Sequence, residues 1–262
     1  MPLLSVITAG YAPKSDYLKD TVISVLEQDV PPGWEFEWLF QEDGTTPCLG
    51  DLVQQVPQAR YEANDRSFGI AATRNLALSR GRGDLLRVLD HDDVLLPGAL
   101  SKAITHFVEH QGIHWLLTAS DEIDFAGKRY SCPPPPMSGW LPRGSMGPIT
   151  DSNGRWSVYS AGLTARLDTV RALGGWMAAP RSEDVGLVTA LAEVADGYID
   201  PCAGWLYRRH PVQTHLDDDW QARESQAATL VTQRLAAMRS AGVMLRNTAS
   251  LSFKTFSDNE AR

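Results

Sequence analysis

The sequence has little cysteine, no long apolar run and no excess of basic side chains. Its 262 residues include three cysteines, Cys48, Cys132 and Cys202, an odd number at wide spacing with no pair spaced like metal ligands. We therefore expect reduced structural thiols in a cytoplasmic protein. No stretch is apolar for long enough to span a bilayer, and residues 1–8 lack the basic segment and apolar run of a signal peptide. Without a transmembrane segment, the chain is expected to meet its substrates in the cytosol or at a membrane surface.

The charge balance is acidic, with 32 Asp and Glu against 24 Lys and Arg and a formal net charge of -8. Phosphate backbones need clustered basic side chains, so this balance argues against nucleic acid as the main partner. It argues equally against docking on an anionic membrane through a basic patch. Apolar residues make up 43% and charged residues 21%, which is typical of a globular protein with a sizeable core.

Short apolar strands alternate with amphipathic helices along much of the chain. One helix should begin near Ser15, because Leu18, Val22 and Val25 fall on one face, and Pro31 should end it. Further helices are predicted over 70–80, after Pro97, near Asp168 and over 183–195, and strands over 3–8, 35–41, 85–89 and 115–119. This order predicts an α/β fold with a mostly parallel central sheet flanked by helices.

The second half of the chain is less regular than the first. Between about Gly127 and Trp156 the pattern breaks, with four consecutive prolines at 133–136, and long loops of this kind are often functional. Beyond Asp217 the sequence predicts one polar, amphipathic helix to about Ser240, followed by a weakly patterned tail. We therefore expect a C-terminal helical extension.

Two acidic clusters, Glu42-Asp43 and Asp90 to Asp93, follow predicted strands. In open α/β sheets, ligands bind beyond the carboxyl ends of the strands. On an extended segment Asp90 and Asp92 point the same way, and two convergent carboxylates suit Mg²⁺ or Mn²⁺, which completes its coordination with diphosphate oxygens. An isolated acidic cluster is more often a solvated turn that caps the next helix, so the pair alone leaves both interpretations open.

Several ordered segments over residues 3–215 resemble the inverting family 2 glycosyltransferases, which have the GT-A (Rossmann-like) fold. The segments LLSVITAGYAP and YLKDTVISVLEQ are similar to the family's first strand, nucleotide loop and first helix. EDGT at 42–45 is similar to its DDGS element, with Glu42 in place of the first aspartate, and LDHDD at 89–93 is similar to its DxD motif. The other similar segments are RSFG at 66–69, ATRN at 72–75, SED at 182–184 and YRRHP at 207–211.

The resemblance implies a nucleotide-diphosphate sugar as donor, with UDP favoured, and gives roles to single residues. Asp43 would lie at the base and ribose, where a carboxylate can accept the imide N–H of uracil, although a turn residue before Gly44 is the alternative. Arg74 would face the diphosphate or the sugar, unless it is a solvated helix residue. The nucleotide-sugar set that the resemblance implies is Thr8, Ala9, Tyr11, Glu42, Asp43, Arg74, Asp90 and His91.

The resemblance also implies a metal site and a catalytic base. Asp92 would bind the divalent metal, Mn or Mg, with His210, or less readily His215, as a further ligand. Asp184 would be the general base, although Glu183-Asp184 could instead be a capping pair at a helix N-terminus. Glu183, Trp140 and Trp156 are predicted on the acceptor side, because aromatic faces can stack on sugar rings.

Together these features predict a metal-dependent inverting glycosyltransferase that acts on a hydroxyl or amine of a small-molecule, glycan or lipid-linked acceptor. Residues 1–215 would form the glycosyltransferase domain, with a nucleotide-sugar-binding half over 1–122 and an acceptor-binding half over 123–215, and residues 216–262 a helix and tail. A second possibility keeps the fold but changes the chemistry, as in a nucleotidyltransferase or a retaining transferase, and the nucleotidyltransferase is less favoured because Lys14 alone is basic near the first loop. A non-catalytic carbohydrate- or nucleotide-binding domain is the third possibility.

Overall fold

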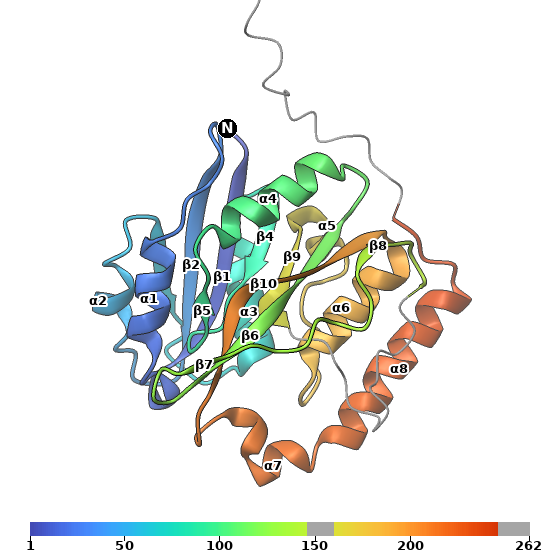
Figure 1. Cartoon of the computed structure of the whole chain (residues 1–262). Helices are drawn as coiled ribbons and strands as arrows, with labels where there is room; N and C mark the ends of the chain where they lie inside the picture. Colours follow the sequence, from blue (N-terminus) through green and yellow to red (C-terminus); the bar gives the residue numbers. More distant parts are fainter. Residues whose placement is uncertain (146–159, 246–262) are drawn as a thin grey trace, which may run out of the picture.

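The computed structural model describes residues 1–145 and 160–245, which form one ten-stranded sheet between two layers of helices (Figure 1). The strands are β1 (Leu3–Tyr11), β2 (Glu35–Asp43), β3 (Ala59–Ala63), β4 (Leu85–Val88), β5 (Val94–Leu95), β6 (Trp115–Asp124), β7 (Arg129–Tyr130), β8 (Gly139–Leu141), β9 (Leu163–Arg166) and β10 (Gly197–Arg209). The α-helices are α1 (Leu18–Leu26), α2 (Gly50–Val53), α3 (Ile70–Arg80), α4 (Ala99–Glu109), α5 (Leu167–Ala172), α6 (Glu183–Val194), α7 (Asp218–Gln221) and α8 (Glu224–Ser240). Short 3-10 helices are η1 (Ala12–Lys14), η2 (Ser160–Gly162) and η3 (Thr214–Leu216).

The strand order is β3-β2-β1-β4-β9-β6-β10-β5, with β7 on β6 and β8 on β10. Strands β1 to β4 pair in parallel, as does β6 with β10, so the predicted α/β class is confirmed. The sheet is mixed because β9 lies antiparallel between β4 and β6, and β5 lies antiparallel to β10. We call the side of the sheet where β1 to β4 end the carboxyl edge, and the opposite side the amino edge.

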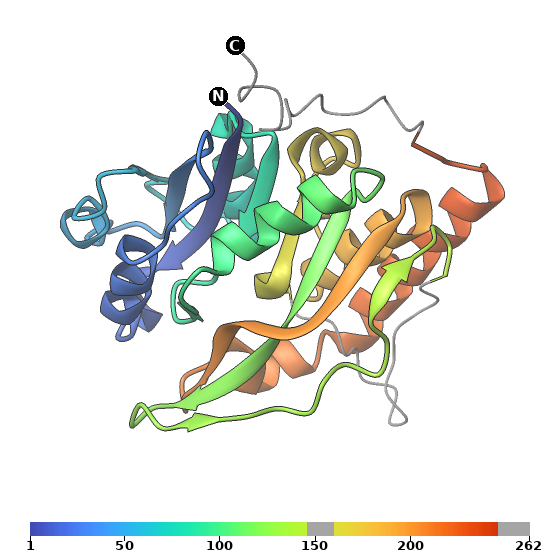
Figure 2. The same cartoon turned by 45° about the horizontal axis from the view of Figure 1, so that its top comes forward.

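Both faces of the sheet are buried by helices. Leu4 and Val6 of β1 belong to the core under α1, α2 and α4, whereas Ile7 belongs to the core under α3, α5 and α6, as the period of two in a strand requires. Figure 2 shows α4 crossing one face of the strands while α6 and α8 lie behind the other. The predicted helix over 70–80 coincides with α3, and the helix predicted after Pro97 is α4.

The C-terminal extension contacts the body of the protein through α6. Val231 and Leu235 of α8 pack on Val185 of α6 in a small separate core. The prediction of one continuous helix beyond Asp217 was wrong, since α7 ends at Gln221 and α8 begins at Glu224. The prediction of a loop from about Gly127 to Trp156 covers β7 and β8, and its last part, residues 146–159, lies outside the described residues.

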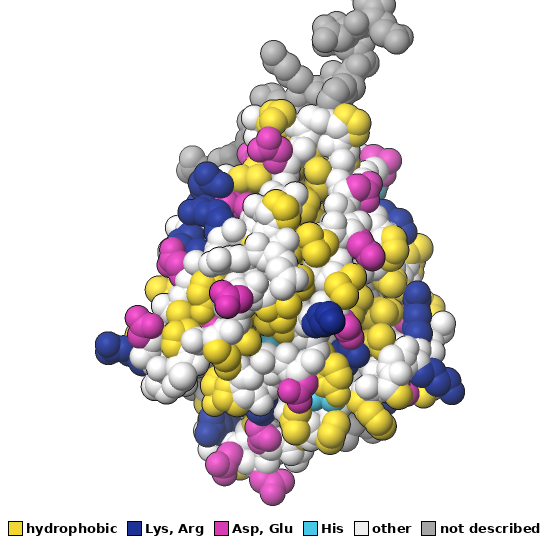
Figure 3. All heavy atoms as spheres, turned by 90° about the vertical axis from the view of Figure 1, so that its left-hand side faces the viewer, with side chains coloured by type: hydrophobic (Ala, Val, Ile, Leu, Met, Phe, Trp, Pro, Cys, Tyr) yellow, Lys and Arg dark blue, Asp and Glu magenta, His cyan; other side chains and the backbone are white. Residues whose placement is uncertain are grey.

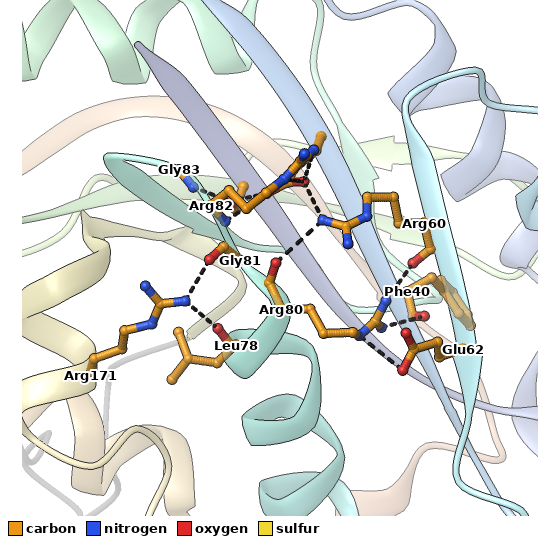
Figure 4. A network of polar contacts seen from close by, with 11 residues as sticks. Phe40, Arg60, Glu62, Leu78, Arg80, Gly81, Arg82, Gly83 and Arg171 are labelled. Atoms are coloured by element: carbon orange, nitrogen blue, oxygen red, sulfur yellow. Dashed lines mark hydrogen bonds and ion pairs between the residues drawn. The ribbon is translucent and has the colours of Figure 1, made fainter.

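Arginines fix the amino edge, where the C-terminal end of α3 meets the start of β4 (Figure 4). Arg60 and Arg82 bind the carboxylate of Glu37, which is 5% exposed. Arg80 donates to the carbonyls of Phe40 and Arg60, and Arg171 donates to the carbonyls of Leu78 and Gly81 at the end of α3. Cationic side chains at a helix C-terminus complement the helix dipole, so this network stabilises the junction of α3 with the sheet.

The surface beside α1 and α2 carries acidic and basic side chains interspersed with apolar ones (Figure 3). None of the helices in the described part of the chain is both long and apolar enough to cross a membrane.

Candidate active site

The candidate site lies at the carboxyl edge, where segments from both halves of the chain meet. In the first half, β1 and β2 end side by side, with Gly10 opposite Glu42 and Tyr11 opposite Asp43. The segment 90–93 follows β4, the next strand of the sheet. The second half adds the first turn of α6, with Glu183 and Asp184, and the residues at and just after the end of β10.

Glu42 is used within the protein. Its Oε1 accepts the amide of Cys48 at 2.9 Å, and its Oε2 accepts the amide of Leu49 at 2.9 Å and the hydroxyl of Tyr61 at 2.6 Å. Burial and this carboxylate raise the pKa of Tyr61. Because Leu49 immediately precedes α2, Glu42 fixes the first turn of that helix. Its place beside a nucleotide stays a prediction.

Asp43 organises the loop between β3 and α3. Its Oδ1 accepts Asn64 Nδ2 at 2.9 Å and the amide of Phe68 at 2.7 Å, and its Oδ2 accepts Ser67 Oγ at 3.2 Å and the amide of Gly69 at 3.0 Å. Burial alone would raise the pKa of Asp43, but these hydrogen bonds outweigh it and lower the pKa. Gly69 has a φ of 82°, a conformation that favours glycine, and it lets the amide turn toward the carboxylate. Asp43 therefore shapes the wall of the site that follows β3.

Backbone strain is concentrated at this edge. Within residues 1–145 and 160–245, the non-glycine residues with positive φ are Asp65 at 57° and Ser182 at 58°. Asp65 lies in the loop that Asp43 holds, and Ser182 immediately precedes Glu183 and Asp184 at the start of α6. Such conformations cost about 1–3 kcal/mol and are typical of functional sites.

The end of β1 forms the floor of the predicted nucleotide site. Thr8 and Ala9 are buried, and Thr8 Oγ1 accepts Trp38 Nε1 at 2.9 Å. Tyr11 is 40% exposed at the carboxyl edge, so its ring is available for stacking on a planar ligand.

Asp92 meets His210, 118 residues later in the chain. Nε2 of His210 lies 3.0 Å from Oδ2 of Asp92, and the histidine side chain is 1% exposed. Burial alone would raise the pKa of Asp92, but the hydrogen bond from His210, with the neighbouring His91 and His210 rings, outweighs burial and lowers the pKa. His215 lies elsewhere, with Nδ1 3.4 Å from the hydroxyl of Tyr207. The structure therefore brings His210, rather than His215, to the acidic motif.

Two further residues hold the acidic motif in place, and the sequence argument gave them no role. Arg208 donates from its amide to Oδ1 of Asp93 and from Nε to the carbonyl of Asp92, both at 2.9 Å. Asp93 is buried, and burial together with the charge of Asp92 raises its pKa. The YRRHP motif at 207–211 includes Arg208, but the motif alone does not predict that this arginine binds the segment with Asp92 and Asp93.

His91 connects the acidic motif to the loop after β1. Its Nε2 lies 3.0 Å from the carbonyl of Lys14, to which it can only donate. Nζ of Lys14 in turn lies 2.8 Å from Oδ2 of Asp217, so η1 is joined to the segment before α7. The contact gives His91 a positioning role beside the predicted nucleotide site.

Arg74 joins the two halves of the site. Its Nη1 donates to Oε1 of Glu183 at 2.8 Å, and its Nη2 donates to Oδ1 of Asp90 at 2.5 Å. The guanidinium is 3% exposed, Glu183 is 4% exposed and Asp90 is 32% exposed. Asp184, the next residue of α6, is partly exposed, and its Oδ1 accepts the amide of Val185 at 2.8 Å.

Both carboxyl groups at the start of α6 have pKa values above their ordinary range. Burial, with the charge of Asp184, raises the pKa of Glu183 to about 7. Burial also raises the pKa of Asp184, against the opposing charge of Arg74. A carboxylate with a raised pKa is a better proton acceptor at neutral pH, as a general base requires.

The two predicted acceptor-side tryptophans are not placed alike. Trp140 lies in β8 with its ring 6.2 Å from that of His110, beside the start of β10 at the amino edge. Trp156 lies outside the described residues. A group of three or more His, Cys, Asp or Glu side chains arranged to hold a metal is not found among residues 1–145 and 160–245.

Residues 5–131 match the model of Glycosyl transferase family 2. Over 112 residues the chain is 34% identical to TuaG of Bacillus subtilis, which is named for teichuronic acid biosynthesis. Over 131 residues it is 28% identical to the uncharacterized glycosyltransferase MJ1057 of Methanocaldococcus jannaschii. These alignments cover 41% and 48% of this chain but 43% and 44% of the relatives, so the chain spans less than half the length of the curated relatives it matches.

Solved structures of S. aureus TarS share the fold. TarS 1–349 in complex with UDP-GlcNAc aligns with a TM-score of 0.66 at 16% identity, over 90% of this chain and 66% of that one. The complex of TarS 1–349 with UDP aligns with a TM-score of 0.62 at 18% identity, over 92% of this chain and 74% of that one. The expected GT-A fold is confirmed.

Proposed function

We propose, from the premise that residues 5–131 are a family 2 glycosyltransferase domain, that this chain moves a sugar from a UDP-sugar to a hydroxyl or amine acceptor with inversion. The observation that carries the proposal is the meeting of two pairs at one edge, Asp92 with His210 and Glu183 with Asp184. The UDP-GlcNAc and UDP complexes of TarS support a UDP-linked donor.

The donor nucleotide would lie between the ends of β1 and β2. Tyr11 is exposed there for stacking on the base, and the loop that Asp43 holds forms the adjacent wall. Both oxygens of Asp43 already accept two hydrogen bonds each, so its contribution to nucleotide recognition is mainly to fix this wall.

Asp92 and His210 fit a divalent metal. A carboxylate oxygen and an imidazole nitrogen are both donors that such cations accept, and these two atoms face each other at 3.0 Å. Two protein ligands suffice where diphosphate oxygens complete the coordination. Asp92 and His210 would hold the cation, which when bound would supply positive charge to the leaving nucleotide diphosphate. Arg208 keeps the backbone of this segment in place.

Asp184 is the proposed general base. It takes the proton of the acceptor hydroxyl while the acceptor oxygen bonds to the anomeric carbon and the bond from that carbon to the diphosphate oxygen breaks. The electron pair of that bond leaves with UDP. Attack from the face opposite the leaving group inverts the configuration. The N-terminus of α6 stabilises the carboxylate before it takes the proton.

The position of Trp140 bears on the length of the acceptor. Asp184 is the second residue of α6, whereas Trp140 pairs with Tyr198 just after that helix ends. Ten residues of helix, 185–194, lie between Asp184 and that end, which is about 15 Å. Trp140 can therefore contact an acceptor held at Asp184 only if the acceptor is extended, such as a glycan chain.

The experiment is to measure UDP release from UDP-GlcNAc with Mn²⁺, with and without excess EDTA, for the wild type and Asp92→Ala. Turnover should require the metal, and Asp92→Ala should remain folded but inactive, since the metal loses its carboxylate ligand. Thermal shift with UDP-sugars, with and without Mn²⁺, identifies the donor, because a ligand of the folded state raises the melting temperature. Full turnover in EDTA would defeat the metal proposal, and UDP-sugar binding without any turnover would favour a binding domain.

A further inference from the structure

Arg74 lies at an unusual place for a substrate ligand. Its side chain is 3% exposed, and each of its terminal nitrogens already donates to a carboxylate, one on Asp90 and one on Glu183. The two carboxylates come from opposite sides of the site, 16 residues and 109 residues away along the chain. The planar guanidinium suits such a bridge because its donors form a fixed fork.

The surroundings of Arg74 hold it in one orientation. The guanidinium carbon lies 5.8 Å from the ring centre of Trp176, and its Nε is buried with no hydrogen-bond partner in the described part of the chain. A buried ion pair of this kind is costly to break, because removal of one partner leaves a buried charge without compensation. Glu183 follows the strained residue Ser182, so this contact fixes the first turn of α6.

We propose that Arg74 is a positioning residue, which ties Asp90 to Glu183 so that Asp184 is held in place for the acceptor, and that it makes no contact with the diphosphate. The proposal rests on the proposed role of Asp184 as general base.

The same contact sets the charge around the base. Burial raises the pKa of Glu183 and of Asp184, and the charge of Asp90, on the loop after β4, raises both further. The charge of Arg74, on α3, lowers both pKa values. On the remaining side, Arg234 of α8 donates to the carbonyls of Leu173 and Gly186. Removing Arg74 therefore leaves the carboxylates with higher pKa values, and Asp184 stays protonated up to a higher pH.

The test is the pH profile of kcat, with the donor KM, for Arg74→Gln and Arg74→Lys. In Arg74→Gln the acidic limb of the kcat profile should move up by about one pH unit, so that kcat at pH values on that limb falls up to about tenfold and recovers as the pH rises. The donor KM should stay within about threefold of wild type, since Arg74 is proposed to make no contact with the bound donor. Arg74→Lys keeps the charge but cannot bridge both carboxylates, so kcat should fall with the limb unmoved.

The control is Arg80→Gln, at the other end of the same helix, where Arg80 is 14% exposed and pairs with Glu62. The kcat of Arg80→Gln and the acidic limb of its pH profile should match the wild type.

A large rise in donor KM with an unmoved acidic limb in Arg74→Gln would identify a diphosphate ligand and overturn the proposal. An equal loss of kcat at every pH in Arg74→Gln, which removes the charge, would show a merely structural role and would overturn the proposal as well. Should Arg74→Gln fail to fold, Arg74→Lys decides, because a raised donor KM with normal kcat in that variant contradicts positioning. Near-normal kcat in Asp184→Asn would instead defeat the proposed function.

Discussion

The two edges of the sheet use the same ionic side chains for opposite purposes. At the amino edge, one buried carboxylate, Glu37, meets two arginines, Arg60 and Arg82. At the carboxyl edge, one buried arginine, Arg74, meets two carboxylates, those of Asp90 and Glu183. Helix α3 spans the sheet between them, from Ile70 at one edge to Arg80 at the other.

The ratio of charges decides what each edge can do. Where cations exceed carboxylates, hydrogen bonds outweigh burial and lower the pKa of Glu37, so the group stays ionised and only holds the fold together. Where buried carboxylates exceed cations, the pKa of Glu183 rises to about 7, and the edge can exchange protons near neutral pH. A hollow of about 360 Å³, lined in part by Arg60 and Arg82, lies at the amino edge.

The largest expected effect on activity is at Asp184, at the carboxyl edge. Asp184→Asn keeps the shape of the side chain but cannot accept the acceptor's proton, so kcat should fall about 10²–10⁴-fold while donor binding stays nearly intact. The measurement is steady-state kinetics, with the product's anomeric configuration read from NMR coupling constants. A product that retains the donor's configuration, or an Asn variant with near-normal kcat, would contradict the assignment.

At the amino edge, Glu37→Gln should cost stability rather than activity. The change removes the partner of two arginines, which costs about 2–3 kcal/mol after allowance for the exposure of Arg60 and Arg82. Urea unfolding at pH 7 measures this, and kcat of the folded variant should be unchanged.

The stabilisation by Glu37 should also depend on pH, which acid unfolding measures. Because the folded pKa of Glu37 is lowered, its stabilisation is fully present above the unfolded pKa, about 4.3, and is lost as the pH falls through the folded value. The wild type should therefore lose stability below about pH 4.3 more steeply than Glu37→Gln. Parallel acid profiles for the two proteins would show that Glu37 carries no such linkage.

The smallest expected effect belongs to Asp43, which stabilises a loop at the carboxyl edge. Asp43→Ala removes four hydrogen bonds from the segment 64–69 and should weaken UDP binding by about 1–3 kcal/mol. Calorimetry with UDP measures the change. Asp43→Asn keeps the size of the side chain and part of its acceptor capacity, so its UDP affinity should lie between those of the wild type and Asp43→Ala. Unchanged UDP affinity in the alanine variant would mean that the loop does not border the nucleotide.

Local sequence patterns sufficed to predict the helices and strands that have a clear apolar periodicity or a short apolar run. The apolar period along Leu18, Val22 and Val25 predicted α1, and the residues before Glu42 and Asp90 predicted β2 and β4. The strand β9, four residues long, has no such signal, since its place between β4 and β6 depends on pairing with distant strands. The break between α7 and α8 was missed because Ala222 and Arg223 are ordinary helix formers.

The site shows the same division. Placing Asp92 and Asp184 after a strand and at a helix start was within reach of the sequence, because strand ends and helix starts meet at one edge of such a sheet. The partners were not, since Arg208 and Asp93 are 115 residues apart, and no local rule pairs them. Residue type did not predict the partners of Glu42 and Asp43 either, since both accept hydrogen bonds from backbone amides and side chains of the protein, and their place beside the nucleotide stays a prediction.

The antiparallel strand β9 has a consequence for the order in which the protein assembles. As the chain emerges from the ribosome, β4 and β6 are complete by residue 124, yet residues 163–166 must still arrive to fill the space between them. Until then both strands present open sides, which are templates for pairing with other chains. Contacts of such sequence separation form slowly, so we expect the amino-terminal half to need protection during synthesis. The carboxyl edge is then among the last parts to form, when Arg208 reaches Asp93.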